Sequence, residues 1–200
     1  MKKIYYLFLA MMAGMCCISC NNEWEDEQFQ QLVSLKAEPN GDGVTPVYVR
    51  YKTGGVVSYN LPVILSGSTM NTQNRTVHIA VDEDTLKSLN KERYGEMDKI
   101  YYEMLTPEYR SFPETVEIPA GECSTTLPIN FTLGGQNGES PLDLSDKYIL
   151  PLTIVDDPSW DYHSNPRKHY RKALLNVIPF NDYSGTYAST QCMITDQDKG

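Results

Sequence analysis

The stretch CSTTLPINFTL, residues 123–133, alternates polar and apolar side chains with the period of a β-strand. A second stretch, GVVSYNLPVILSG at residues 55–67, alternates in the same way. The two apolar faces consist of Leu127, Ile129, Phe131 and Leu133, and of Val57, Tyr59, Leu61, Val63 and Leu65. A slip of one residue would turn either face to water, so the register of both strands is well specified.

Shorter alternations predict further strands, with glycine-containing turns between them at 40–43, 53–55, 119–121 and 134–138. Their apolar sets are Val47, Val49 and Tyr51; Val77, Ile79 and Val81; and Leu150, Leu152 and Ile154. Seven or more short strands separated by turns are typical of a β-sandwich. We therefore expect an all-β fold, an immunoglobulin-like (Ig-like) β-sandwich over residues 31–179.

One short helix is expected among these strands, from Asp82 to about Arg93. Asp82 or Asp84 can cap it, and Leu86 with Leu89 supplies a single apolar contact point. Proline on the polar phase of a strand favours an edge strand or a bulge. Three predicted strands carry such a proline: Pro62, Pro128 and Pro151.

The first nineteen residues have the pattern of a signal peptide. Lys2 and Lys3 precede an uncharged run over 4–18, which is shorter than the roughly twenty residues that span a bilayer. A transmembrane anchor is the alternative, but the polar, acidic residues that follow do not continue an apolar span. Residues 18–20, Ile-Ser-Cys, resemble the lipobox of bacterial lipoproteins, although Cys17 stands where Leu is usual. We expect a signal peptide over 1–19 and lipidation of Cys20, which holds the chain to a membrane by buried acyl chains.

An acidic tether is expected over residues 20–30. The run NNEWEDE, residues 21–27, lacks core residues and resembles the surface-export signal of Bacteroidetes lipoproteins. An ordinary solvated tether is the alternative. The expected location is the outer membrane, with a lipid anchor and exposure at the cell surface.

The charge of the chain argues against nucleic acid as a partner. The full chain has a formal net charge of −9, and without the signal peptide, 15 basic and 26 acidic residues give −11. Phosphate contacts need clustered Lys and Arg. The nearest approach to a cluster is Arg167, Lys168, Arg171 and Lys172, which alternates with His169 and Tyr170 as one solvated face of a strand would.

Two further predictions concern the remaining cysteines and the end of the chain. Cys123 and Cys192 are expected to be unpaired, mostly buried thiols, although the export route also permits a disulfide. Near Phe180 the character of the sequence changes, and FNDYSGTYAST opens what looks like a second, truncated β domain over 180–200. We therefore expect the chain to be the front portion of a longer protein.

The order of several motifs resembles one known family. The motifs are YNLPVILSG (59–67), VHIAVDEDTLKSLN (77–90), YEMLTPEYRSFPETVEIPAGECSTTLPINF (102–131) and LDLSDKYILPLTIVD (142–156). Together they resemble domain-of-unknown-function family 1735, the N-terminal Ig-like domain of Bacteroidetes surface lipoproteins. Members of that family are encoded in polysaccharide-utilisation loci beside glycan importers. The resemblance implies a setting of surface glycan capture and carries over no catalytic residues.

The candidate binding site is the loop DDPSWDYHSNPRKHY, residues 156–170. Trp160, Tyr162 and Tyr170 can offer flat faces to sugar rings, and His163 can bond to hydroxyls, as in an open binding site. The alternative is structural: Trp160 plugs the end of the sandwich core and the loop is a surface crossover.

The sequence gives less support for a metal site, an enzymatic site or a site of O-glycosylation. Asp156, Asp157 and Asp161 supply oxygen atoms, but no calcium loop surrounds them, so we expect neither a metal nor another cofactor. No Gly-x-Ser-x-Gly elbow, His-Glu-x-x-His pair or phosphate loop is present, and we expect no enzymatic activity. Thr85, within an Asp-Thr-Leu that resembles a Bacteroidetes O-glycosylation acceptor, is expected to be exposed at the start of the helix.

The sequence thus predicts a non-catalytic cell-surface lipoprotein module that spaces or presents a glycan-binding region in polysaccharide capture. Its expected partners are outer-membrane lipid through the N-terminal acyl chains, glycans and a glycan-import complex. Two alternatives stay open. The Ig-like domain itself binds glycan through the 156–170 loop, or the chain is an adhesin or assembly subunit that polymerises by strand donation.

Overall fold

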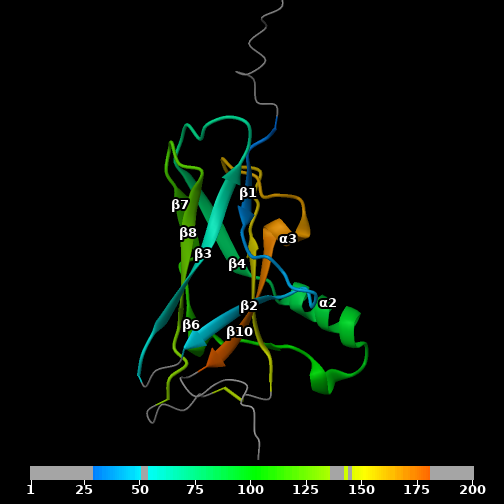
Figure 1. Ribbon diagram of the computed structural model, residues 1–200. Coiled ribbons are helices and arrows are strands. Elements are labelled where there is room, and N and C mark those ends of the chain that lie inside the picture. Colours follow the sequence, from blue (N-terminus) through cyan, green and yellow to red (C-terminus); the bar gives the residue numbers. More distant parts are fainter. Residues whose placement is uncertain (1–28, 51–53, 136–141, 144–145, 181–200) are drawn as a thin grey trace, which may run out of the picture.

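The computed structural model describes residues 29–50, 54–135, 142–143 and 146–180, and the strands within these ranges form two sheets (Figure 1). The four-stranded sheet has the order β1 (Leu32–Leu35), β3 (Val57–Ser66), β8 (Ser124–Phe131) and β6 (Arg110–Ser111). The six-stranded sheet has the order β2 (Thr45–Arg50), β10 (Lys172–Phe180), β9 (Tyr148–Ile154), β4 (Arg75–Val81) and β7 (Thr115–Ile118), and β5 (Glu103–Met104) also pairs with β9. The helices are α2 (Glu83–Tyr94), α3 (Lys168–Arg171) and the 3-10 turns η1 (Asp98–Ile100) and η2 (Pro107–Tyr109). The predicted all-β sandwich with one short helix is confirmed, since α2 is the only helix longer than one turn among the described residues.

The main core lies between the two sheets and is built from the alternating faces. Strands β3 and β8 pair antiparallel from Val57 opposite Phe131 to Ile64 opposite Ser124. Every apolar side chain predicted to share their inner faces lies in this core or packs against it. Burial of each large apolar side chain stabilises the fold by about 1.5–3 kcal/mol, so these alternating faces contribute strongly to the packing of the two sheets.

All three prolines lie on inner strands, Pro128 on β8 between β3 and β6, which corrects the expectation of edge strands or bulges. Pro62 belongs to β3 and Pro151 to β9, and each lies where a neighbouring strand has just ended. The carbonyl of Pro62 accepts from Lys36, the residue after β1, and that of Pro151 accepts from Asp82, the residue after β4. Because the nitrogen and the carbonyl of a strand residue face the same side, each of these two proline nitrogens faces the residue just after the neighbouring strand, and the reciprocal ladder pairing stops there.

Helix α2 covers part of the outer face of the six-stranded sheet. Its cap is Asp82, whose carboxylate accepts from the Thr85 N–H at 3.1 Å and from the Thr85 hydroxyl at 2.7 Å. The predicted cap and contact point are therefore confirmed. A second apolar cluster joins helix and sheet: Val44, Leu86, Tyr102, Ile149 and Leu174, with Leu89, Tyr94 and Met104 packed against it. Strands β9 and β10 are thus covered on both faces.

A buried amide fixes the C-terminal half of α2 to the segment that follows it. The side chain of Asn90 donates to the carbonyl of Tyr102 and accepts from its N–H, both at 2.9 Å. Asn90 is 5% exposed and Tyr102 is 3% exposed, so both bonds are protected from water. The pair holds the helix in one position over the sheet.

Three local predictions are corrected or fall outside the described residues. Residues 168–171 form the single turn α3 and not the face of a strand, because Arg171 N–H closes a helical bond to the carbonyl of Arg167. The Cys123 thiol is exposed, whereas a mostly buried thiol was expected, and Cys192 lies outside the described residues. Strand β10 reaches Phe180, so this residue pairs within the sandwich.

The predicted signal peptide, the lipidated Cys20, almost all of the tether and the predicted second domain after Phe180 also lie outside the described residues. Within the part of the chain that the structure describes, no helix has the length and apolar character needed to cross a membrane.

Candidate functional site

The four predicted glycan-binding residues follow β9, three on the loop that leads to α3 and Tyr170 on α3 itself, and the structure divides them. Trp160 and Tyr162 pack against the main core beside His78 of β4. His163 and Tyr170 are exposed and lie outside this group. The four side chains therefore do not form one continuous aromatic surface.

His78, Trp160 and Tyr162 form an aromatic stack. The ring centroids of His78 and Trp160 are 3.8 Å apart, and those of Trp160 and Tyr162 are 5.7 Å apart. Tyr162 is 2% exposed; its hydroxyl donates to the carbonyl of Val155 at 2.7 Å and accepts from the His78 N–H at 3.0 Å. Burial raises the pKa of Tyr162 to about 12. Such packing is the arrangement expected of a structural plug, the alternative interpretation of Trp160.

The rest of the loop is held by bonds to its own protein. Val33 of β1 donates to the carbonyl of His163 and accepts from the N–H of Asn165, both at 2.8 Å. The carboxylate of Asp156 accepts from the backbone and the hydroxyl of Ser164 and lies 3.4 Å from the guanidinium of Arg171. Among the described residues, no group of three His, Cys, Asp or Glu side chains is arranged to hold a metal ion.

Thr85 is buried, which corrects the expectation that it is exposed. Its side chain donates to Asp82 and accepts from the ammonium of Lys172, and the residue is only 5% exposed. The sequence around Thr85 contains no sign of this contact, because Lys172 is 87 residues away. A transferase acting on the folded domain would find this hydroxyl already bonded.

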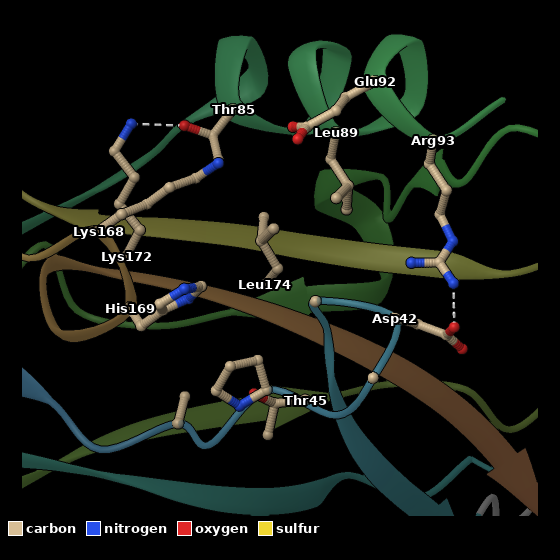
Figure 2. A pocket seen from close by; sticks show the side chains of 14 residues that line it. Asp42, Thr45, Thr85, Leu89, Glu92, Arg93, Lys168, His169, Lys172 and Leu174 are labelled. Carbon is tan, nitrogen blue, oxygen red and sulfur yellow. Dashed lines mark hydrogen bonds and ion pairs between the residues drawn. The ribbon is translucent and has the colours of Figure 1, made fainter. Parts of the chain in front are cut away.

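A cleft of about 480 Å³ lies between α2, the turn that leads into β2, and the α3–β10 segment (Figure 2). We call it the helix cleft. Leu89 of α2 and Leu174 of β10 form its apolar floor, and the backbone of Gly41 and Gly43 lines one side. Its polar side chains are Asp42, Thr45, Thr85, Glu92, Arg93, Lys168, His169 and Lys172.

One end of the helix cleft is closed by an ion pair between Arg93 and Asp42 (Figure 2). The turn that presents Asp42 is shaped by the side chain of Asn40, which accepts from the N–H of Asp42 at 2.8 Å. Gly43 has φ of +77°, a left-handed conformation that favours glycine. The residues 40–43, recognised in the sequence only as a turn, therefore also form a wall of the cleft.

The other end is cationic. Lys172 forms an ion pair with Asp82 at 2.7 Å and also donates to Thr85. Burial by itself raises the pKa of the Asp82 carboxyl, but the hydrogen bonds from Lys172 and Thr85 outweigh it, and the pKa lies below the ordinary 3.8. Lys168 lies beside Lys172, at the same end of the cleft (Figure 2).

Three ionisable side chains of the cleft have no protein partner among the described residues: Glu92, Lys168 and His169. Figure 2 shows their polar ends directed toward the cavity, Glu92 from α2 and the other two from α3. The sequence signal for this site was the basic cluster at 167–172 in an otherwise acidic chain. The cluster alone did not indicate a cavity, because α2 and the 40–43 turn are distant in the sequence.

The fold and the cleft define a class: an all-β sandwich with a helix over one outer face and a polar cleft beneath that helix. Within this class, the chain belongs to the family of the Domain of unknown function DUF4973, whose model matches residues 24–158. The match ends before α3, so the cationic end of the helix cleft lies outside the matched range.

Solved structures from Bacteroides share the fold. A protein of unknown function from Bacteroides ovatus is 51% identical over 78% of this chain, with a TM-score of 0.67. A multidomain protein including DUF1735, also from Bacteroides ovatus, is 49% identical over 78% of this chain, with a TM-score of 0.66. An auxiliary nutrient binding protein from Bacteroides thetaiotaomicron is 41% identical over 73% of this chain, with a TM-score of 0.63.

These comparisons refine the expected family. The expected domain family, DUF1735, appears in the name of one similar structure, whereas the family model that matches this chain is that of DUF4973. The matches cover 48%, 47% and 47% of those three proteins, so this chain spans about half of their length. No curated protein matches the chain.

Proposed function

We propose that this chain is a non-catalytic module of nutrient capture at a bacterial cell surface. In this proposal a lipid on Cys20 anchors the chain, and the sandwich holds the segment beyond Phe180 away from the membrane. The captured nutrient is a polysaccharide, and the segment beyond Phe180 leads into the region that binds it.

One observation carries the proposal: the polypeptide chain enters the sandwich at one end and leaves it at the other. Strand β1 begins at Leu32, opposite Ser66, the last residue of β3, whereas β10 runs to Phe180 at the far end (Figure 1). Strand β3 has ten residues, so the two ends are separated by about 33 Å at the usual rise per residue. A module of this geometry acts as a spacer.

Two further findings support a spacer over a binding surface at the predicted loop. Tyr162 is buried and Trp160 is half-buried against His78 and the core, so the two rings do not form a shared open platform, although Trp160 lines a cavity of about 590 Å³. The matched segment makes up only about half of each similar protein, and one of these proteins is named an auxiliary nutrient binding protein. Glycan binding through the 156–170 loop would therefore have to use Trp160 without the buried ring of Tyr162.

Display on intact cells tests the proposal. An epitope inserted directly after Phe180 should react with antibody on whole cells carrying the parent protein. A variant that joins residue 30 directly to the epitope, without the sandwich, should react much less, because its epitope lies within the surface polysaccharide. A matched variant in which an unrelated sandwich of similar length replaces residues 31–180 should restore the reaction.

Two outcomes would overturn the spacer role. One is equal antibody reaction with and without the sandwich. The other is a Cys20→Ala variant that remains on the cell surface and still incorporates labelled fatty acid, which would remove the anchor on which the geometry depends.

A further inference from the structure

We infer that the helix cleft is itself a binding site for one negatively charged sugar residue. The carboxylate or sulfate of that sugar lies at Lys168 and His169, and its ring lies over Leu89 and Leu174. The choice of a sugar rests on the proposed role in polysaccharide capture, whereas the negative charge and the place of binding rest on the cleft alone.

The charges of the cleft favour an anion at its α3 end. Arg93 is neutralised by Asp42, and Lys172 is neutralised by Asp82, so Lys168 is the cation without a carboxylate partner among the described residues. The Lys172 ammonium has three N–H donors, and two of them are used by Asp82 and Thr85. One donor of Lys172 therefore remains beside Lys168, in a chain whose net charge is −9.

The remaining surface suits the uncharged part of a sugar. Leu89 and Leu174 offer apolar contact for the C–H face of a ring, and both belong to the cluster that fixes α2 on the sheet. The Glu92 carboxylate accepts hydrogen bonds and has no protein donor among the described residues, so it is suited to hydroxyl groups. The volume of about 480 Å³ lies within the usual range of roughly 300–1,000 Å³ for small-ligand sites.

The cleft is also pre-formed, which lowers the entropy cost of binding. Asn90 clamps the helix through two buried bonds, the Asp82 cap holds its first turn, and the Asn40 turn fixes the opposite wall. The free side chains therefore project from a rigid frame. Because the charged contacts are solvent-accessible, we expect millimolar binding of a single sugar, with multivalent presentation by a polymer strengthening it.

Binding of three matched monosaccharides tests the inference. Galacturonate carries a carboxylate, galactose 6-sulfate carries a sulfate, and galactose carries neither, so the set varies only the group at C6. Each is titrated into the purified full chain, freed of lipid by Cys20→Ala, and followed by saturation-transfer NMR. At least one charged sugar should bind tenfold or more tightly than galactose, and the one that binds identifies the anion.

Two lysine variants locate the site. Lys168→Ala should weaken binding of the charged sugar at least tenfold and leave weak galactose binding unchanged. Lys91→Ala removes an exposed lysine of α2 that does not line the cleft, and it should bind like the parent. Both side chains are exposed, so neither substitution threatens folding.

Several outcomes would overturn the inference: no binding of any of the three sugars, equal binding of galactose and the charged sugars, or an unchanged affinity in Lys168→Ala. An equal loss in Lys91→Ala would also do so, because the attraction would then be a property of the whole surface. None of these outcomes affects the epitope experiment, which tests the spacer role separately.

Discussion

The aromatic stack and the helix cleft differ in how well their residue types indicate a sugar site. The stack has the residue types associated with glycans, yet Tyr162 is buried and its hydroxyl is already bonded on both sides. The cleft has no Phe, Tyr or Trp side chain, yet Glu92 and Lys168 project into it without protein partners among the described residues. Binding capacity follows from groups that remain unsatisfied, and residue type alone does not reveal which groups those are.

The largest expected effect is on the free energy of unfolding and concerns the aromatic stack. Tyr162→Ala should lower the free energy of unfolding by about 3–5 kcal/mol, because it removes a fully buried aromatic side chain. Tyr162→Phe should cost less, about 1–3 kcal/mol, since only the hydroxyl that serves Val155 and His78 is lost. Urea unfolding measures both. A loss below about 1 kcal/mol for Tyr162→Ala would break the comparison, because the stack would then not be structural.

The next effect concerns the frame of the cleft. Asn90→Ala leaves the N–H and carbonyl of Tyr102 without their partner in a buried position, so it should destabilise the protein by about 2–3 kcal/mol. At temperatures where the variant stays folded, α2 should be less fixed, and binding of the charged sugar should weaken. Faster amide hydrogen exchange in α2 would show that the helix is less fixed. Ser88→Ala is the control, at an exposed position of the same helix. Unchanged exchange would contradict the clamp.

The pH dependence of stability sharpens the role of the cationic end. The pKa of Asp82 is depressed in the folded state, so its charge stabilises the fold above 3.8 and this contribution disappears as the pH falls through the lower folded value. Asp82→Asn keeps an equally good helix cap but loses the ion pair with Lys172. Its unfolding free energy should therefore fall less than that of the parent between pH 5 and pH 2. Parallel curves for the two proteins would show that the pair adds no stability.

The smallest effect is expected at the exposed end of the predicted loop. Tyr170 is 46% exposed, so Tyr170→Ala should change the free energy of unfolding by less than about 0.5 kcal/mol. It should also leave the affinity of the cleft unchanged. If this substitution alone abolished retention of the full protein on a polysaccharide, the exposed loop and not the cleft would be the binding surface.

Patterns with a short period were predictable from the sequence. The alternation around Leu127 and Leu61 placed both strands with the correct inner face, because a period of two leaves a single register with buried apolar side chains. The helix could be bounded to within one residue, since Asp82 supplies a local cap whose bond to Thr85 spans only three positions. Interactions that span only a few positions can be recognised from neighbouring residues in the sequence.

What could not be predicted depends on contacts between distant segments. The outer-face residues Ile149 and Leu174 lie beneath α2, and the nearly continuous apolar run of β9 was the available signal that both faces are covered. The burial of Thr85 and the shape of the cleft depend on Lys172, and no pattern near Thr85 encodes that pairing. The candidate site was therefore the part least accessible from sequence, apart from its basic cluster.

The entry and exit of the chain at opposite ends of the sandwich also have a mechanical consequence. A pull between Leu32 and Phe180 runs along the strands that bear these residues, not across them (Figure 1). Strand β1 is bonded to β3 on one side and to the 163–165 segment on the other, and β10 is bonded to both β2 and β9. The hydrogen bonds of each ladder are then loaded together in shear and cannot be peeled one at a time, so the domain resists a pull applied along the chain.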